Sequence, residues 1–164
     1  MPISFDVNIG EVFRDVVAKA ETNAKIAMKG SLDAMASEAK GLAPKRTSAL
    51  ANSIRAGDIS GSLAGGDLHG VLSATAPGAE AQEFGSGLHG ERGEKYPIRP
   101  RFKKALRFAA AGSVAGGGEG FTFAKGVMHP GVKAKRYLQG GVEAKLDMLS
   151  GELSAAVALA ITKD

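Results

Sequence analysis

The sequence of 164 residues contains no cysteine and no tryptophan, and aromatic residues make up only 5% of it. Without cysteine, the chain has no disulfide framework, no thiol nucleophile and no cysteine-ligated zinc or iron–sulfur site. Because large aromatic side chains are scarce, we expect a core built mainly from alanine, valine, leucine and methionine.

Long apolar runs are missing as well, since none approaches the ~18 residues that span a bilayer. The N-terminal sequence MPISFDVNIGEVF carries acidic residues where a signal peptide has basic ones. We therefore expect a soluble protein that is made in the cytoplasm and does not enter a membrane. The length and the 44% hydrophobic content predict one globular domain over residues 1–164, with an N-terminal arm at residues 1–8.

Positive charge is present in excess, and it is concentrated in one segment. The formal net charge is +4, yet residues 1–90 hold 8 basic and 10 acidic groups, whereas residues 91–164 hold 13 and 7. This excess favours contact with nucleic acid or an acidic protein surface, or else a solvated loop and edge strand whose lysines discourage aggregation. The cations concerned are Arg92, Lys95, Arg99, Arg101, Lys103, Lys104 and Arg107.

Apolar residues at three- and four-residue spacing predict a long amphipathic helix at each end of the chain. The first covers residues 8–42, with Asn8 and Glu11 as a capping box and Pro44 as its stop. The last covers residues 138–160, with Gly151 as a weak point. Its apolar stripe consists of Leu138, Val142, Leu146, Leu149, Leu153, Val157 and Ala160.

Short segments between glycine, proline and serine predict strands in the middle of the chain. We expect them near residues 53–59, 70–75, 104–109 and 121–127, the last two forming a hairpin around residues 110–120. Alternation predicts that Leu106, Phe108, Phe121 and Phe123 share one apolar face. The predicted fold class is α+β, with the N- and C-terminal helices packed on one face of a small, mainly antiparallel sheet. Residues 85–100 and 110–120 are expected to be long, glycine-rich loops.

No arrangement of residues predicts catalysis. Residues 85–90 match G-x-G-x-x-G, but no buried strand precedes them and no helix can follow directly, which argues against a dinucleotide site. Glu80 and Glu83 lie one helical turn apart and could act as an acid and base or bind a cation, although a solvated helix face explains them more simply. We therefore expect no enzyme activity, no cofactor and no metal, and instead a protein that assembles with partners.

Four segments, taken in order, resemble the head–tail joining or tail-completion (neck) proteins of tailed bacteriophages. Residues 43–50, APKRTSAL, resemble the motif A-P-x-x-T-G-x-L, with Ser48 where glycine is usual. Residues 83–87, EFGSG, are similar to its E-F-G-T segment, and residues 98–108 to I-x-P-x-x-x-K-A-L-x-F. The fourth, residues 127–138, is similar to V-x-H-P-G followed by an aromatic residue and leucine. The matching positions are Pro44, Thr47, Leu50, Glu83, Phe84, Gly85, Pro100, Leu106, Phe108, His129, Pro130, Gly131, Tyr137 and Leu138.

The resemblance implies a structural virion protein rather than an enzyme. Its members form a ring, commonly a hexamer, which completes the tail and joins it to the connector and portal of the DNA-filled head. The implied partners are further copies of the chain and the phage connector, head-completion, tail-terminator and tail-tube proteins. DNA could also pass through the ring, and the implied location is the neck of the virion.

Several of these positions have roles that the residue types predict by themselves. Thr47 is expected to cap a short helical turn at residues 48–52. Phe84 is expected to anchor its ring in the core, after which Gly85 reverses the chain. Residues 129–131 read as a turn in which Gly131 takes positive φ. The ring of Tyr137 is expected to pack while its hydroxyl stays in water.

A nucleic-acid-binding protein is the alternative function. In that case Arg99, Arg101, Lys103, Lys104 and Arg107 contact phosphates, and affinity falls steeply with salt.

Overall fold

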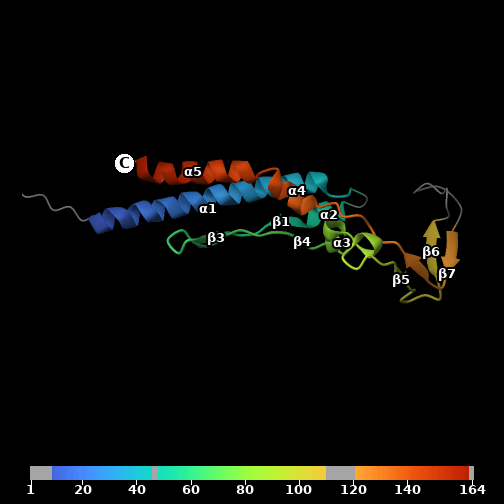
Figure 1. Ribbon diagram of the computed structural model, residues 1–164. Helices are drawn as coiled ribbons and strands as arrows, with labels where there is room; N and C mark the ends of the chain where they lie inside the picture. The colour runs from blue at the N-terminus through green and yellow to red at the C-terminus, as the bar shows by residue number, and fades with distance from the viewer. Residues whose placement is uncertain (1–8, 46–47, 110–120, 163–164) are drawn as a thin grey trace, which may run out of the picture. The chain divides into compact units, whose positions relative to one another are not determined.

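The computed structural model describes residues 9–45, 48–109 and 121–162. In this part of the chain, helices and short antiparallel strands form an α+β fold with long helices at both ends, as the sequence predicts (Figure 1). The chain divides into two compact units, one made by residues 1–79 with 136–164 and the other by residues 80–135.

Helix α1 (Ile9–Leu42) is the longest element of the first unit. It begins directly after Asn8, the predicted cap, which lies outside the described residues. It ends at Leu42 because the residue before a proline, here Ala43, is driven out of the helical conformation and Pro44 has no amide hydrogen to donate. The predicted start and stop of this helix are therefore confirmed to within one residue.

The C-terminal segment forms two helices, α4 (Tyr137–Glu143) and α5 (Leu146–Thr162), rather than one. The predicted weak point at Gly151 is wrong, since α5 continues through it. The interruption falls at Ala144 and Lys145, where the Lys145 N–H donates to the Val142 carbonyl over 3.1 Å. Helix α4 packs closely against α1 at Gly141. This glycine is buried, and a methyl group added to it would lie 2.8 Å from the Ala39 side chain of α1.

Helix α5 lies alongside α1 in the opposite direction (Figure 1). Ser31 of α1 donates to the Glu152 carboxylate over 2.5 Å, and Asn23 donates to the Ala156 carbonyl over 3.4 Å. The α5 residues that become buried are the small ones, Ala156 and Ala160. The predicted apolar stripe is thus only partly correct, because alanine side chains let the helices approach closely while Leu146 and Val157 remain exposed.

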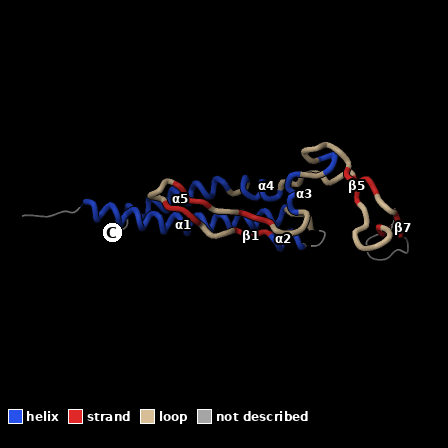
Figure 2. The backbone as a smooth tube through the Cα atoms, turned by 90° about the horizontal axis from the view of Figure 1, so that it is seen from below, coloured by secondary structure: helices blue, strands red, loops and turns tan. Residues whose placement is uncertain are grey.

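Two small sheets complete the first unit. Strands β1 (Ile54–Ala56) and β4 (Leu72–Ala74) pair antiparallel and pack on α1, alongside which they run in Figure 2. They confirm the strands expected near residues 53–59 and 70–75. Strands β2 (Ser60–Ser62) and β3 (Asp67–His69) form a second antiparallel pair that the sequence analysis missed. The signal for it was the Gly65-Gly66 pair in the turn at residues 63–66, directly before Asp67.

The core of the first unit gathers at the end of α1 nearest Leu42. Helix α2 (Ala49–Ser53) contributes Leu50, which is buried with Ile54, Ala79 and Tyr137. Alanines of α1 form the opposing surface, so the core has the alanine-rich character that the composition predicts. Its α1 members are Ala36 and Ala39, with Ala43 directly after the helix.

The second unit is built from short elements. Helix α3 (Ala79–Phe84) is followed by a 3-10 turn (Gly87–His89), and β5 (Tyr96–Ile98) pairs antiparallel with β8 (Val127–His129). The predicted hairpin is confirmed in β6 (Leu106–Ala109) and β7 (Phe121–Ala124), which pair antiparallel. Its predicted loop, residues 110–120, lies outside the described residues.

The side-chain arrangement of that hairpin differs from the prediction. The register pairs Leu106 with Ala124 and Arg107 with Phe123. Directly opposed residues share a face, so Phe121 and Phe123 lie with Arg107 rather than with Leu106 and Phe108. The predicted single apolar face is therefore wrong, because the register differs by one residue from the one that alternation alone favoured.

Candidate functional site

The glycine turn of the second unit joins two of the segments that carry the family resemblance. Ser86 N–H donates to the Val132 carbonyl over 2.9 Å, and Leu88 N–H donates to the Pro130 carbonyl over 2.8 Å. In return, Val132 N–H donates to the Ser86 hydroxyl over 3.2 Å. Residues 85–90, expected to be part of a long loop, are instead held against residues 130–132 by backbone hydrogen bonds.

Both glycines at this turn are required by geometry. Gly85 has φ 83° and Gly131 has φ 91°, which confirms the positive φ predicted for Gly131 and the chain reversal predicted at Gly85. A methyl group on Gly131 would lie 1.8 Å from the Ser86 carbonyl oxygen, and one on Gly85 would lie 2.3 Å from that of His89. The helix α3, not a strand, precedes residues 85–90, which agrees with reading this G-x-G-x-x-G match as a turn.

His129 is the last residue of β8 and belongs to the same turn. Its Nδ1 accepts from the Gly131 N–H over 2.9 Å. Its ring lies 5.4 Å from that of Tyr96, the residue that opposes it on β5. Pro130 is exposed between these two contacts. The histidine thus orients the turn through its side chain.

Two predictions for the aromatic motif residues are wrong. Phe84 does not anchor in the core, since 71% of it is exposed, whereas Glu83 beside it is buried. Tyr137 is completely buried, so its hydroxyl does not stay in water and instead donates to the Ala79 carbonyl over 3.4 Å. Helix geometry turned Glu83 rather than Phe84 inward, an orientation that sequence letters alone could not fix.

The remaining motif positions differ in their burial. Leu50 is buried, and Leu138 packs against the core. Pro44, Pro100, Leu106 and Phe108 are half-buried. Thr47, the predicted cap of α2, lies outside the described residues, and Ser48, which begins that helix, makes no side-chain capping bond. All five cations of the predicted contact set, Arg99, Arg101, Lys103, Lys104 and Arg107, are exposed.

The outer stripe of α5, defined here as Leu146, Val157 and Ile161, is the first of two exposed apolar surfaces on the paired helices. At 3.6 residues per turn these positions fall on one side of the helix. Leu146 and Ile161 are more than half exposed, and Val157 is exposed too. Together they form an apolar surface that neither α1 nor the sheets cover.

The groove surface, defined as Ile26 and Leu159 with Ala155, is the second. Ile26 and Leu159 are both exposed and line a pocket of about 320 Å³ between α1 and α5, together with Glu152 and Asn23. Leu159 is two residues from Val157, which places it about 200° around α5 from the outer stripe. The helix pair therefore carries apolar side chains on two separate sides.

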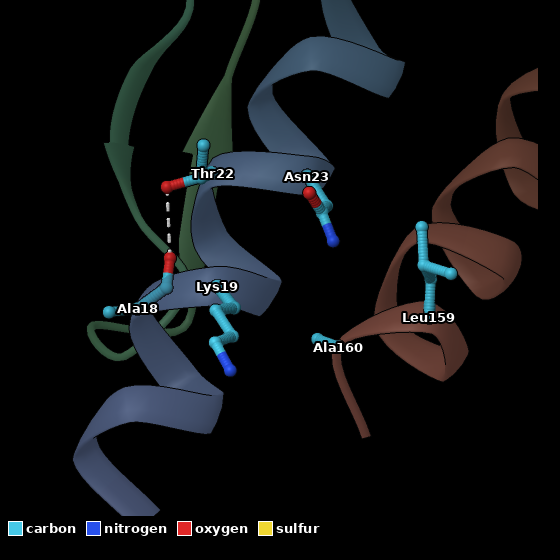
Figure 3. Close-up of a pocket in the computed structure, with 6 residues that line it drawn as sticks. All are labelled: Ala18, Lys19, Thr22, Asn23, Leu159 and Ala160. Carbon is cyan, nitrogen blue, oxygen red and sulfur yellow. Dashed lines mark hydrogen bonds between the residues drawn. The ribbon is translucent and has the colours of Figure 1, made fainter. Parts of the chain in front are cut away.

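A neighbouring pocket of about 520 Å³ extends the groove toward the C-terminal end of α5. Figure 3 shows Lys19 and Asn23 on α1 across from Leu159 and Ala160 on α5, while Thr22 donates back to the Ala18 carbonyl over 3.0 Å. Half of the lining residues are apolar, and the others supply one amide, one ammonium and one hydroxyl group. It offers surface for packing rather than a set of reacting groups.

A scan against protein-family models, a search of curated proteins and a search of solved structures found no match to this chain. Its function must therefore be argued from its own residues and from the motifs they form.

Few groups suited to catalysis or metal binding come together among the described residues. Among them, no three histidine, aspartate or glutamate side chains come close enough to hold a metal ion. No helix within the described ranges has the length and apolar character needed to cross a membrane. Of the candidate sites, the two apolar surfaces and the basic hairpin of the second unit are the ones that present exposed groups to a partner.

Proposed function

We propose that this chain is a structural protein of the neck of a tailed bacteriophage, where copies of it form a ring that completes the tail and joins it to the connector and portal. Its implied partners are further copies of itself and the connector, head-completion, tail-terminator and tail-tube proteins. In this role it has no catalytic activity and no cofactor. Two lines of argument support the proposal.

The first line of argument is the position of the motif residues. Leu50 of the first motif segment and Tyr137 of the fourth meet in one core, together with Ile54. The segments around Gly85 and Gly131, from the second and fourth, meet in one turn. Because these motif residues contact each other, the fold itself explains why the motifs occur in the same chain. Their role is then structural.

The second line of argument, and the observation that carries the proposal, is the presence of two different apolar surfaces on the α1–α5 pair. A ring closes through heterologous contacts, in which one surface of each subunit binds a different surface of its neighbour. The outer stripe and the groove surface lie on different sides of α5, as such contacts require. Burial of exposed apolar side chains is also the main favourable term in stable association.

Charge-bearing variants of the two surfaces test this arrangement. We expect light scattering after gel filtration of the purified full-length chain to show oligomers. Val157→Asp in the outer stripe and Leu159→Asp in the groove surface should each give monomers. Ala158→Asp, at an exposed position between the two surfaces, is the matched control and should assemble normally.

A mixture of the two variants distinguishes ring contacts from a symmetric dimer. In a heterologous contact, the intact groove surface of Val157→Asp can still bind the intact outer stripe of Leu159→Asp, so the mixture should form heterodimers that go no further. In a symmetric contact of the outer stripe with itself, Leu159→Asp would remain dimeric. Mixing it with Val157→Asp would then produce no heterodimer. That result, or normal assembly of both single variants, would refute the proposed ring contact.

A further inference from the structure

The hairpin of the second unit carries an arrangement of side chains that ring assembly leaves unexplained. Arg107 of β6 lies opposite Phe123 of β7 and on the same face as Phe121. The Arg107 guanidinium carbon lies 4.1 Å from the centroid of the Phe121 ring, within the range of a cation–π interaction. One face of the hairpin therefore carries a cation that stacks on the Phe121 ring and lies opposite Phe123 in the register.

These rings are not core residues. Phe123 is 64% exposed, Phe121 is also more than half exposed, and Phe102, just before β6, is 94% exposed. Single exposed apolar residues are common on protein surfaces. This chain has few aromatic residues, however, and three of its phenylalanines are exposed in this one hairpin and the segment before it. Their apolar faces are available to a partner.

Further cations lie in the same stretch of sequence, at positions 101, 103 and 104 next to Phe102 and before β6. We define the basic-aromatic patch as the residues Arg101, Phe102, Lys103, Lys104, Arg107, Phe121 and Phe123. Every cation in it is exposed, and none takes part in the ion pairs formed between described residues, which use Lys25, Lys29, His69 and Lys145. Among the described residues, no ion pair neutralises the positive charge of the patch, and this charge favours a polyanionic partner.

We propose that the basic-aromatic patch binds single-stranded nucleic acid. The lysine and arginine side chains match the charge of a phosphate backbone, and exposed phenyl rings stack on unpaired bases. A duplex would satisfy the cations but hides its base faces within the helical stack, so it would leave the phenyl rings without partners. An acidic protein surface would likewise use the cations alone.

Fluorescence anisotropy of a labelled oligothymidylate of about 20 nucleotides, titrated with the full-length chain, tests the proposal. We expect binding at low salt that weakens as salt rises, with a slope of log affinity against log salt of about −3 for four neutralised phosphates on a single strand. Phe123→Ala and Phe102→Ala should each weaken binding about fivefold to a hundredfold. Lys103→Gln should weaken binding and also make the salt slope shallower by about one phosphate.

Matched controls separate stacking from general loss of apolar surface. Phe13 on α1 is 66% exposed, close to the value for Phe123, so Phe13→Ala should leave binding unchanged. Lys40→Gln on α1 is the corresponding control for Lys103→Gln. Because the patch lies outside the two apolar surfaces, its variants should retain the oligomeric state of the unmodified chain, so that failure of this proposal and failure of ring assembly remain distinguishable.

Three outcomes would overturn the proposal. The first is equal or tighter binding of a duplex of the same length. The second is binding to phosphatidylserine vesicles in the absence of any binding to the oligonucleotide, which would assign the patch to an anionic membrane surface. The third is equal affinity of Phe123→Ala and the unmodified chain.

Discussion

Ser48 holds a backbone conformation that its side chain disfavours. Its φ is 53°, and apart from glycines only Arg136 shares a positive φ among the described residues. Positive φ brings Cβ of an L-residue close to a carbonyl oxygen, at a cost of about 1–2 kcal/mol. The resemblance places glycine at this motif position, and the positive φ of this residue explains why glycine would suit it.

Ser48→Gly is therefore expected to raise the free energy of unfolding. Relief of the backbone strain outweighs the extra entropy that glycine brings to the unfolded chain, leaving a net gain of about 0.5–1 kcal/mol. Urea denaturation followed by circular dichroism would measure it. Ser37→Gly, an exposed site within α1, is the control and should lower stability by about 0.5 kcal/mol. Equal losses for both variants would contradict the argument.

Gly131 combines positive φ with a close backbone contact, and the two effects can be separated. Gly93 has φ 62° with no neighbouring atom within 4 Å of an added methyl group, whereas Gly131 would clash with Ser86. Gly93→Ala should cost about 1 kcal/mol for its φ alone. Gly131→Ala should cost at least about 2 kcal/mol more, because the backbone of residues 85–87 must move. Hydrogen exchange of Ser86 and Leu88 amides would measure the loosening, and equal protection in the two variants would count against a required contact at Gly131.

At the scale of elements, α4 is held on α1 by a glycine. Gly141→Ala would place its methyl group 2.8 Å from the Met35 carbonyl oxygen as well as from the Ala39 side chain. Overpacking of this kind costs about 1–3 kcal/mol, so thermal unfolding should occur at lower temperature. Gly151→Ala is the opposite case, because nothing lies within 4 Å and the position is inside α5. It should stabilise the chain by about 1 kcal/mol. If Gly141→Ala and Gly151→Ala changed the stability in the same direction, close packing of α4 on α1 would be ruled out.

The turn after β2 is fastened to α1 by one carboxylate. Glu21 Oε1 accepts from the Lys25 ammonium over 2.6 Å, while Oε2 accepts from the Ser62 hydroxyl over 2.9 Å and from the Leu63 N–H over 3.2 Å. The Lys25 ammonium and then the Ser62 hydroxyl lower the pKa of the Glu21 carboxyl, against a smaller opposing effect of burial. The charged form of Glu21 is therefore favoured in the folded chain.

This shift has a definite sign in the dependence of stability on pH. A carboxyl whose pKa is lowered by folding contributes stability above its unfolded pKa of about 4.3, and the contribution is lost as pH falls through the lowered folded value. Glu21→Gln should therefore be less stable than the unmodified chain at pH 7, with the difference shrinking below about pH 4. Lys25→Gln keeps the hydrogen bonds from Ser62 and Leu63 to Glu21, so its stability should lie between those of Glu21→Gln and the unmodified chain. If the difference between the urea midpoints of Glu21→Gln and the unmodified chain stays constant across this pH range, Glu21 has no such role.

At the scale of the whole molecule, the proposed neck function predicts the phenotype of its loss. Phage particles made without this chain should appear in electron micrographs as DNA-filled heads and separate tails. Supplying the unmodified chain or Ala158→Asp should restore joined particles, whereas Val157→Asp should not, because ring contacts are lost while the fold is kept. Normally joined, infectious particles in the absence of the chain would exclude the neck role.

The sequence by itself determined the elements whose causes are local. The end of α1 followed from Pro44, since the missing proline amide acts within one helical turn. The positive φ of Gly131 followed from a turn motif, and the α+β class followed from the order of helical and strand periodicities. These features depend on neighbours along the chain, so the residue types were enough to predict them.

Only the tertiary structure decided which side chains face inward. Periodicity marked Leu146, Val157 and Ala160 as part of the inner face of the last helix. Close approach to α1 buries Ala160 together with Ala156, which was outside the stripe, and leaves Leu146 and Val157 exposed. Alternation placed Phe121 and Phe123 with Leu106, but the register of β6 and β7 placed them with Arg107. Packing distance and strand register are set by segments far apart in the sequence, and a shift of one residue along a strand moves every side chain to the other face. The two exposed apolar surfaces and the basic-aromatic patch, on which both proposals rest, are consequences of those long-range choices.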